Sequence, residues 1–270
     1  MKMNRTWAAF KLDPYYLTRY LGLHAAVLLI VGLALNYWGT FIPHFQLTWS
    51  SLWLLPLAFL AGIQIPVLMH NCTHGNLKGR LLNNVVGELS AFFCLMGLNV
   101  VRINHNLHHA FADTQRDPHD PANKSFFAFI FTAQITGVQI IRETFLSFHG
   151  DTSFNRALFT SDVVLQYLGH FLRAWVWYLL LGPGLFIAFF IPAFITFSLA
   201  FAHVNYITHQ KGHDGDVEVI NKDDNLYYNF INFIGSGVYY HHNHHRNPKL
   251  MNPMKYGQKS FSLREQRAIS

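Results

Sequence analysis

Four long apolar stretches dominate this sequence of 270 residues and limit the folds open to it. Each is close to the roughly 20 residues that an α-helix needs to cross the hydrocarbon core of a bilayer. The stretches lie at about 20–38, 52–69, 163–181 and 185–204. Gly182, Pro183 and Gly184 separate the last two, which is typical of a tight turn. We therefore expect an all-α integral membrane protein with four transmembrane helices, in which residues 1–270 form a single domain.

Composition supports this interpretation. Hydrophobic residues make up 51% of the chain and charged residues only 13%, whereas about 25% charged residues is usual in a soluble domain. The alternative interpretation is that the four stretches are buried helices of a large soluble protein.

The basic residues predict how the chain is oriented. Nineteen of the twenty lysines and arginines fall in the N-terminal segment, in residues 70–162 or after residue 204, and only Arg173 lies inside a predicted span. Basic residues favour the cytoplasmic side of a membrane, so both termini and the middle segment are expected there. The chain has no basic run, and we expect no nucleic-acid partner. If only one of the apolar stretches 85–101 and 126–141 crossed the membrane, the segments after it would change sides and the one-sided distribution of basic residues would be lost. Both are therefore expected to lie at the interface or beneath a cytoplasmic cap.

Histidines are unusually frequent, at seventeen, and their spacing is regular. The sequence contains one HxxxH box, MHNCTHGN, and two HxxHH boxes, INHNLHHAF and YYHHNHHRNP. Residues three and four apart share one face of a helix. A fourth cluster, HVNYITH, places Asn205 and His209 four residues apart, just past the last span. The boxes consist of His70 and His74; His105, His108 and His109; and His241, His244 and His245.

These eight histidines and His209 offer nine nitrogen donors, too many for one metal ion and suitable for two. All are expected on the cytoplasmic side close to the membrane, with the first and fourth clusters at the ends of spans. Imidazole binds iron, zinc, copper and nickel, so the donor set alone does not name the metal. Each ligand ring needs an acceptor for its second nitrogen. The candidate acceptors are Asp113, Asp117, Asp120 and Glu88. The isolated His24, His44, His149 and His170 are expected to be structural.

At these residues the sequence resembles the membrane fatty acid desaturase superfamily, which has three histidine boxes and a non-haem di-iron centre. HNLHHAFADTQRDPHDP (105–121) and GSGVYYHHNHHRNP (235–248) are similar to segments of the acyl-CoA-type delta-9 desaturases. The HxxxH first box is closer to that of acyl-lipid desaturases and carotenoid ketolases. NYITH (205–209) is similar to a fourth element, which implies that His209 binds iron and that Asn205 reaches it through water. His242 stands where related enzymes have asparagine, so we expect it not to be a ligand.

The resemblance implies a fatty acyl desaturase with two iron ions (Fe²⁺/Fe³⁺) and O₂ as co-substrate. The expected partners are an acyl thioester or acyl lipid and an electron donor of the ferredoxin, rubredoxin or cytochrome b5 type. Apolar residues of the spans and of 126–148 are candidates for lining an acyl tunnel. Arg102, Lys124, Arg142 and Lys249 are candidates for binding a phosphate headgroup or an acidic redox protein, although such residues are more often simply solvated.

Two alternative functions stay open at this stage. The same iron pair can support hydroxylation or ketolation of an alkyl chain or carotenoid. A membrane metal transporter would instead place ionisable residues along the middle of several spans. The predicted spans contain few such residues, so the sequence favours an oxidase.

Overall fold

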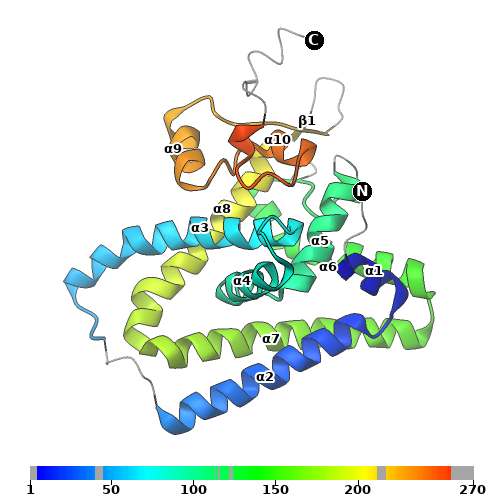
Figure 1. Cartoon of the computed structure of the whole chain (residues 1–270), viewed down its shortest axis with the longest axis horizontal. Coiled ribbons are helices and arrows are strands. Elements are labelled where there is room, and N and C mark those ends of the chain that lie inside the picture. Colours follow the sequence, from blue (N-terminus) through cyan, green and yellow to red (C-terminus); the bar gives the residue numbers. More distant parts are fainter. Residues whose placement is uncertain are drawn as a thin grey trace.

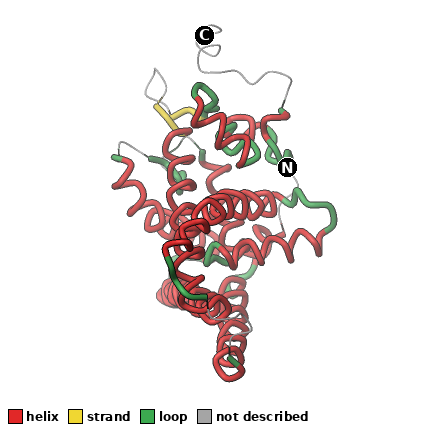
Figure 2. Tube along the Cα trace, turned by 90° about the vertical axis from the view of Figure 1, so that its left-hand side faces the viewer, coloured by secondary structure: helices red, strands yellow, loops and turns green. Residues whose placement is uncertain are grey.

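The computed structural model describes residues 5–39, 45–112, 114, 116–121, 124–211 and 217–256. Almost all of the regular structure in these ranges is helical (Figures 1 and 2). The helices are α1 (Arg5–Leu12), α2 (Tyr16–Trp38), α3 (Leu54–His74), α4 (Arg80–Phe93), α5 (Leu98–Phe111), α6 (Phe126–His149), α7 (Ser153–Leu185), α8 (Ile191–Thr208), α9 (Leu226–Ile234) and α10 (His241–Arg246). Short 3-10 turns at Trp49–Trp53 and Pro253–Lys255, and a π-helical turn at Phe186–Phe190, complete the helical elements.

Three helical segments of the described chain are long and apolar enough to span a membrane: Tyr16–Trp38, Trp49–His74 and Ser153–Thr208. The last has 56 residues, about 84 Å at 1.5 Å per residue, which is enough for two spans. It is broken at Gly182, whose φ of 68° and ψ of 165° are not helical. Only glycine adopts such angles readily, and this break lies in the predicted turn at 182–184.

Most of the side chains in these segments are not covered by protein. Only 28%, 28% and 22% of the most apolar 18-residue windows in the three segments are buried. Exposed side chains on α2 and α7 include Leu23, Ile30, Val164 and Phe171. In water such surfaces would be costly, whereas hydrocarbon solvates them without cost. The chain is therefore a mostly helical membrane protein.

The long helices pack as neighbours, α2 along α7 and α3 along α8 (Figure 1). At Gly62 of α3 the backbones are so close that an added Cβ would lie 2.5 Å from the carbonyl oxygen of Ala193 on α8. At the far end of the bundle an added Cβ at Gly184 would lie 2.0 Å from the carbonyl oxygen of Phe45. The two connections, before α3 and between α7 and α8, therefore meet at the end of α3 opposite to its histidines.

The apolar stretch 85–101 does not form one continuous helix. The chain forms α4 and α5 there, with axes that differ by 93°, and Leu95 between them has a φ of +59°. Together the two helices are apolar enough for a span, but the bend prevents a straight crossing. The apolar stretch 126–141 forms the first part of the longer α6.

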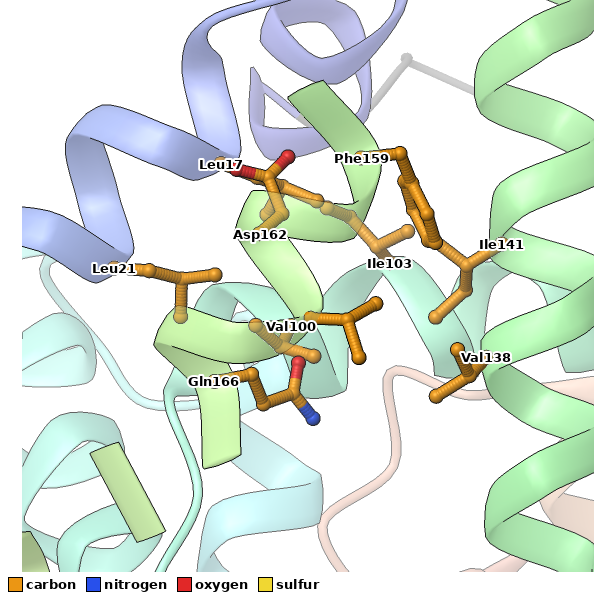
Figure 3. Close-up of a pocket in the computed structure, with 10 residues that line it drawn as sticks. Leu17, Leu21, Val100, Ile103, Val138, Ile141, Phe159, Asp162 and Gln166 are labelled. Carbon is orange, nitrogen blue, oxygen red and sulfur yellow. The ribbon is translucent and has the colours of Figure 1, made fainter. Parts of the chain in front are cut away.

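The bend turns α5 so that one face packs on a hydrophobic core and the other carries the second histidine box. Ile103 and Leu107 are fully buried in this core, with Phe145 of α6 and Phe159 of α7. A small cavity of about 30 Å³ marks where α2, α5, α6 and α7 meet (Figure 3). At its rim Thr18 Oγ1 donates to Asp162 Oδ1 over 2.5 Å, which ties α2 to α7.

A short antiparallel β pair, which an all-helical fold does not include, follows α8. Strand β1 (His209–Lys211) pairs with β2 (Val217–Val219), and His209 lies opposite Val219. A further bridge joins Asn221 to Tyr240, the residue before α10. These pairings bring the end of α8 and the start of α10 together.

Candidate metal centre

The first histidine box forms the last turn of α3. His70 and His74 lie on one face, with ring centroids 5.1 Å apart. The helix continues five residues past the predicted span, because it ends only at Gly75, which has a left-handed φ of 70°. That extension places both imidazoles beyond the apolar part of α3.

The second box lies on α5, and its spacing gives the helical face that the sequence predicted. His105 and His108 are buried, at 7% and 0% exposure. His109 follows on the same side, with its ring 4.5 Å from that of His105. The core packing of Ile103 and Leu107 fixes the rotation of this helix.

The third box forms the short helix α10, which is held by the amide of Asn243 between its histidines. Asn243 is buried; its backbone N–H donates to Asn221 Oδ1, and its Oδ1 accepts from Asn221 Nδ2 at 3.0 Å. Its Nδ2 also donates to the carbonyl oxygen of Pro253 at 3.2 Å. Asn221 and Asn243 were not among the predicted site residues, because they are 22 residues apart and local spacing does not reveal the bond between them.

Two groups of four histidines result, and each combines residues from different boxes. In each group one nitrogen per residue lies within 4.8 Å of the others. The first group consists of His70, His74, His105 and His244, and the second of His108, His209, His241 and His245. His109 belongs to neither group but lies between them: its Nε2 is 3.0 Å from both His105 Nε2 and His244 Nε2, and its ring is 4.4 Å from that of His245.

Bound metal ions explain the spacing of the donor nitrogens better than hydrogen bonds between the rings do. His105 Nε2 faces His70 Nε2 at 3.0 Å, His74 Nε2 at 2.7 Å and His109 Nε2 at 3.0 Å. One ring nitrogen carries at most one proton, so these contacts cannot all be hydrogen bonds. Metal–nitrogen bonds of about 2.0–2.1 Å place neighbouring ligand nitrogens roughly 3 Å apart. The two groups could therefore each hold a metal ion.

Burial keeps the third box in the neutral form that metal binding needs. Desolvation lowers the pKa of His245 to about 2, with smaller contributions from neighbouring histidines. It holds the pKa of His241 and of His244 well below the usual range for the same reason. Neutral imidazole presents a lone pair to a cation, whereas imidazolium does not.

Asp117 is the acceptor that the structure places against the second group. His108 donates from Nδ1 to Asp117 Oδ1 over 2.7 Å, and His209 Nδ1 lies 3.9 Å from Asp117 Oδ2. The same carboxylate accepts the backbone N–H of His119 at 2.8 Å. A carboxylate on Nδ1 fixes the tautomer that leaves Nε2 for a metal.

Asp120 and Glu88 are the other predicted acceptors within the described residues. Asp120 donates from its backbone N–H to the carbonyl oxygen of Asp117 at 3.2 Å, and Asp113 lies outside the described residues. Glu88 lies elsewhere: its carboxylate accepts from Tyr20 Oη at 2.9 Å, so it does not orient the ligand rings. Asn205 is buried on the last turn of α8, where its Nδ2 donates to the carbonyl oxygen of Phe201 at 2.8 Å.

Four other described histidines make contacts with backbone carbonyl oxygens. His242 donates to Val219, His24 to Tyr20, His149 to Phe10 and His170 to Leu95. None of them belongs to either group among the described residues. The predicted structural role of His44 falls outside the described residues.

His119 is a residue near the site that the sequence analysis missed. It is buried, its ring lies 4.9 Å from that of His108, and burial lowers its pKa to about 3. Its position in the segment DPHDP, directly after the second box, was the available signal.

Fold and site together define a helical membrane protein with two histidine groups that could hold metal ions. The model of the fatty acid desaturase family matches residues 47–252, which include all three boxes and His209. The chain belongs to this family.

Two curated relatives match at low identity. Acyl-CoA 5-desaturase AL21 of Anemone leveillei is 28% identical over 225 residues, and delta-9 acyl-lipid desaturase 2 of Arabidopsis thaliana is 24% identical over 214 residues. Each match covers 74% of this chain, but only 63% and 65% of the respective relative. No solved structure matches the chain.

Proposed function

We propose that this protein is an O₂-dependent di-iron desaturase that introduces a double bond into a fatty acyl chain. The observation that carries the proposal is the pair of four-histidine groups within the segment that matches the family. The named activities of the two relatives, on acyl-CoA and on acyl lipid, favour an acyl substrate. Their different carriers leave acyl thioester and acyl lipid as the two candidates for this chain.

Nine histidines act as the ligands in this proposal, the eight of the two groups and His109 between them. Asn205 acts through water. Bound iron would supply activation of O₂ and removal of two hydrogens from adjacent methylenes, with two electrons from an external carrier. The chain itself keeps the rings of the third box neutral and orients His108 through Asp117. Its apolar helices would surround the acyl chain and exclude water.

The substrate would enter from lipid, because the exposed surfaces of the spans are apolar. The termini and the metal centre would face the cytoplasm, as the distribution of basic residues favours. An external electron donor of the ferredoxin, rubredoxin or cytochrome b5 type would then reach the centre from that side. Reporter fusions to the C-terminus would test the orientation, and an external location would contradict it.

Expression of the chain in a host, followed by mass spectrometry of its acyl chains, tests the reaction. New double bonds with the wild type, and none with His244→Ala, would support desaturation. Hydroxylated or keto products would overturn desaturation in favour of oxygen insertion on the same site. Metal uptake by cells without any lipid change would instead favour a transporter.

A further inference from the structure

The last turn of α3 ends in carbonyl groups that its own helix cannot pair, as every helix does. Two of these carbonyls belong to Cys72, which lies between the box histidines His70 and His74, and to His74 itself. Their bonding partners therefore decide how the first box sits relative to the other two.

The first of these carbonyls accepts from Asn83 Nδ2 of α4 at 2.9 Å and from Arg102 of α5. Arg102 Nη2 donates to the carbonyl oxygen of Cys72 at 3.1 Å and to Asn84 Oδ1 of α4 at 2.9 Å, while Nη1 donates to Asn99 Oδ1 at 3.1 Å. The rigid planar guanidinium fixes all three directions at once, which an ammonium group cannot do. Arg102 lies three residues before His105, so this contact links the first box directly to the second.

Lys249 binds the second carbonyl from the segment after the third box. Its Nζ donates to the carbonyl oxygen of His74. Two amides reinforce this junction: Asn76 Nδ2 donates to the carbonyl oxygen of Pro248 at 2.9 Å, and Asn71 Nδ2 donates to that of Met251 at 3.3 Å. A cation at the C-terminus of a helix also interacts favourably with the helix dipole.

These contacts concern only one of the two histidine groups. The first group takes His70 and His74 from α3, His105 from α5 and His244 from α10, whereas the second group has no residue from α3. The contact of Arg102 joins α5 to α3, and the contact of Lys249 joins the segment after α10 to α3. The first group takes its histidines from these three helices. In addition, the guanidinium of Arg102 is bound within the protein, which disfavours the headgroup role considered from the sequence.

We propose that Arg102 and Lys249 are positioning residues that set the geometry of the first histidine group, and of that group alone, by bonding to the carbonyl end of α3. This inference rests on the proposed function only in that it requires two metal ions per chain. It predicts an asymmetric defect, since the first group should lose affinity while the second keeps it.

The test is a titration of the purified, metal-free full chain in detergent with Co²⁺, following ligand-field absorption and bound cobalt by equilibrium dialysis. Arg102→Met should leave one ion bound with wild-type affinity and weaken the other by roughly 10–100-fold, the usual cost of removing a group that orients ligands. Arg102→Lys should recover part of this loss, and Lys249→Met should weaken the same ion to a smaller degree. Arg142→Met, which removes an exposed arginine of α6, is the matched control and should bind as the wild type does.

A variant that does not fold would bind neither ion, so Asn84→Ala provides a milder perturbation of the same contact. It should weaken one ion only, while size-exclusion profiles and melting temperatures of the metal-free chains stay equal. Equal weakening of both ions in this folded variant, or wild-type affinity in Arg102→Met, would overturn the inference. A wild-type chain that binds fewer than two ions would overturn the proposed function itself. Failure of the positioning inference alone would leave two ions bound in the wild type.

Discussion

His108 donates from Nδ1 to Asp117 Oδ1 over 2.7 Å, and the two side chains are 0% and 1% exposed. A carboxylate can only accept here, so the proton of His108 lies on Nδ1 and the lone pair lies on Nε2. That Nε2 faces His245 Nε2 at 3.1 Å, inside the second histidine group. One buried carboxylate thus sets the tautomer of a candidate ligand.

Replacement of Asp117 should therefore weaken the second group. We expect Asp117→Ala to reduce affinity for one metal ion by roughly 10–100-fold, because His108 loses the acceptor that orients it. Cobalt or zinc titration of the purified chain measures this effect. Asp151→Ala is the control, since Asp151 is an exposed aspartate that pairs with Arg156. Unchanged binding in Asp117→Ala would show that His108 needs no such partner.

His209 lies outside the three boxes, yet its ring is 4.9 Å from that of His108 and 5.1 Å from that of His241. His209→Ala should lose one metal ion and the activity as severely as His244→Ala does, because each removes one of four donors from a group. His149→Ala should keep both ions, since His149 donates to the carbonyl oxygen of Phe10 and belongs to neither group. Metal analysis and lipid profiles of the three variants check this, and an active His209 variant would rule out the nine-ligand set.

The run HHNHH contains adjacent histidines with different expected roles. His244 belongs to the first group, whereas His242 donates to the carbonyl oxygen of Val219. We expect His242→Asn to keep both metal ions and desaturation, and His244→Asn to lose the ion of the first group together with desaturation. Both variants replace histidine with asparagine in the same short helix, so a difference between them reports the position and not the type of substitution. Loss of metal in both would contradict the assignment.

The spacing of each box predicted its helical face correctly, because i, i+3 and i+4 contacts are local. The partnership between boxes could not be predicted in this way. His105 and His108 are three residues apart on α5, but they belong to different groups. Which group each joins depends on the 93° bend before α5 and on the position of α10. The hydrogen bonds of Arg102 to Asn84 and Cys72 could not be predicted either, because they join α5 to α4 and α3, which are distant from it in the sequence.

The close approach of α3 and α8 brings the first box and His209 to the same end of the bundle. Gly62→Leu should destabilise the protein by about 1–3 kcal/mol, the usual cost of overpacking, because an added Cβ would lie 2.5 Å from the carbonyl oxygen of Ala193. Thermal melting in detergent measures the loss. Gly22→Leu is the control, since no atom lies within 4 Å of an added Cβ there. Equal melting temperatures for the two variants would contradict this packing.

The content of iron in the purified protein tests the central claim most directly. After reconstitution with Fe²⁺, elemental analysis should find one iron for each of the two histidine groups. His74→Ala and His241→Ala should each remove one iron, and the double variant should remove both. A chain that retains no iron, or a single iron that is indifferent to which group is disrupted, would contradict the account.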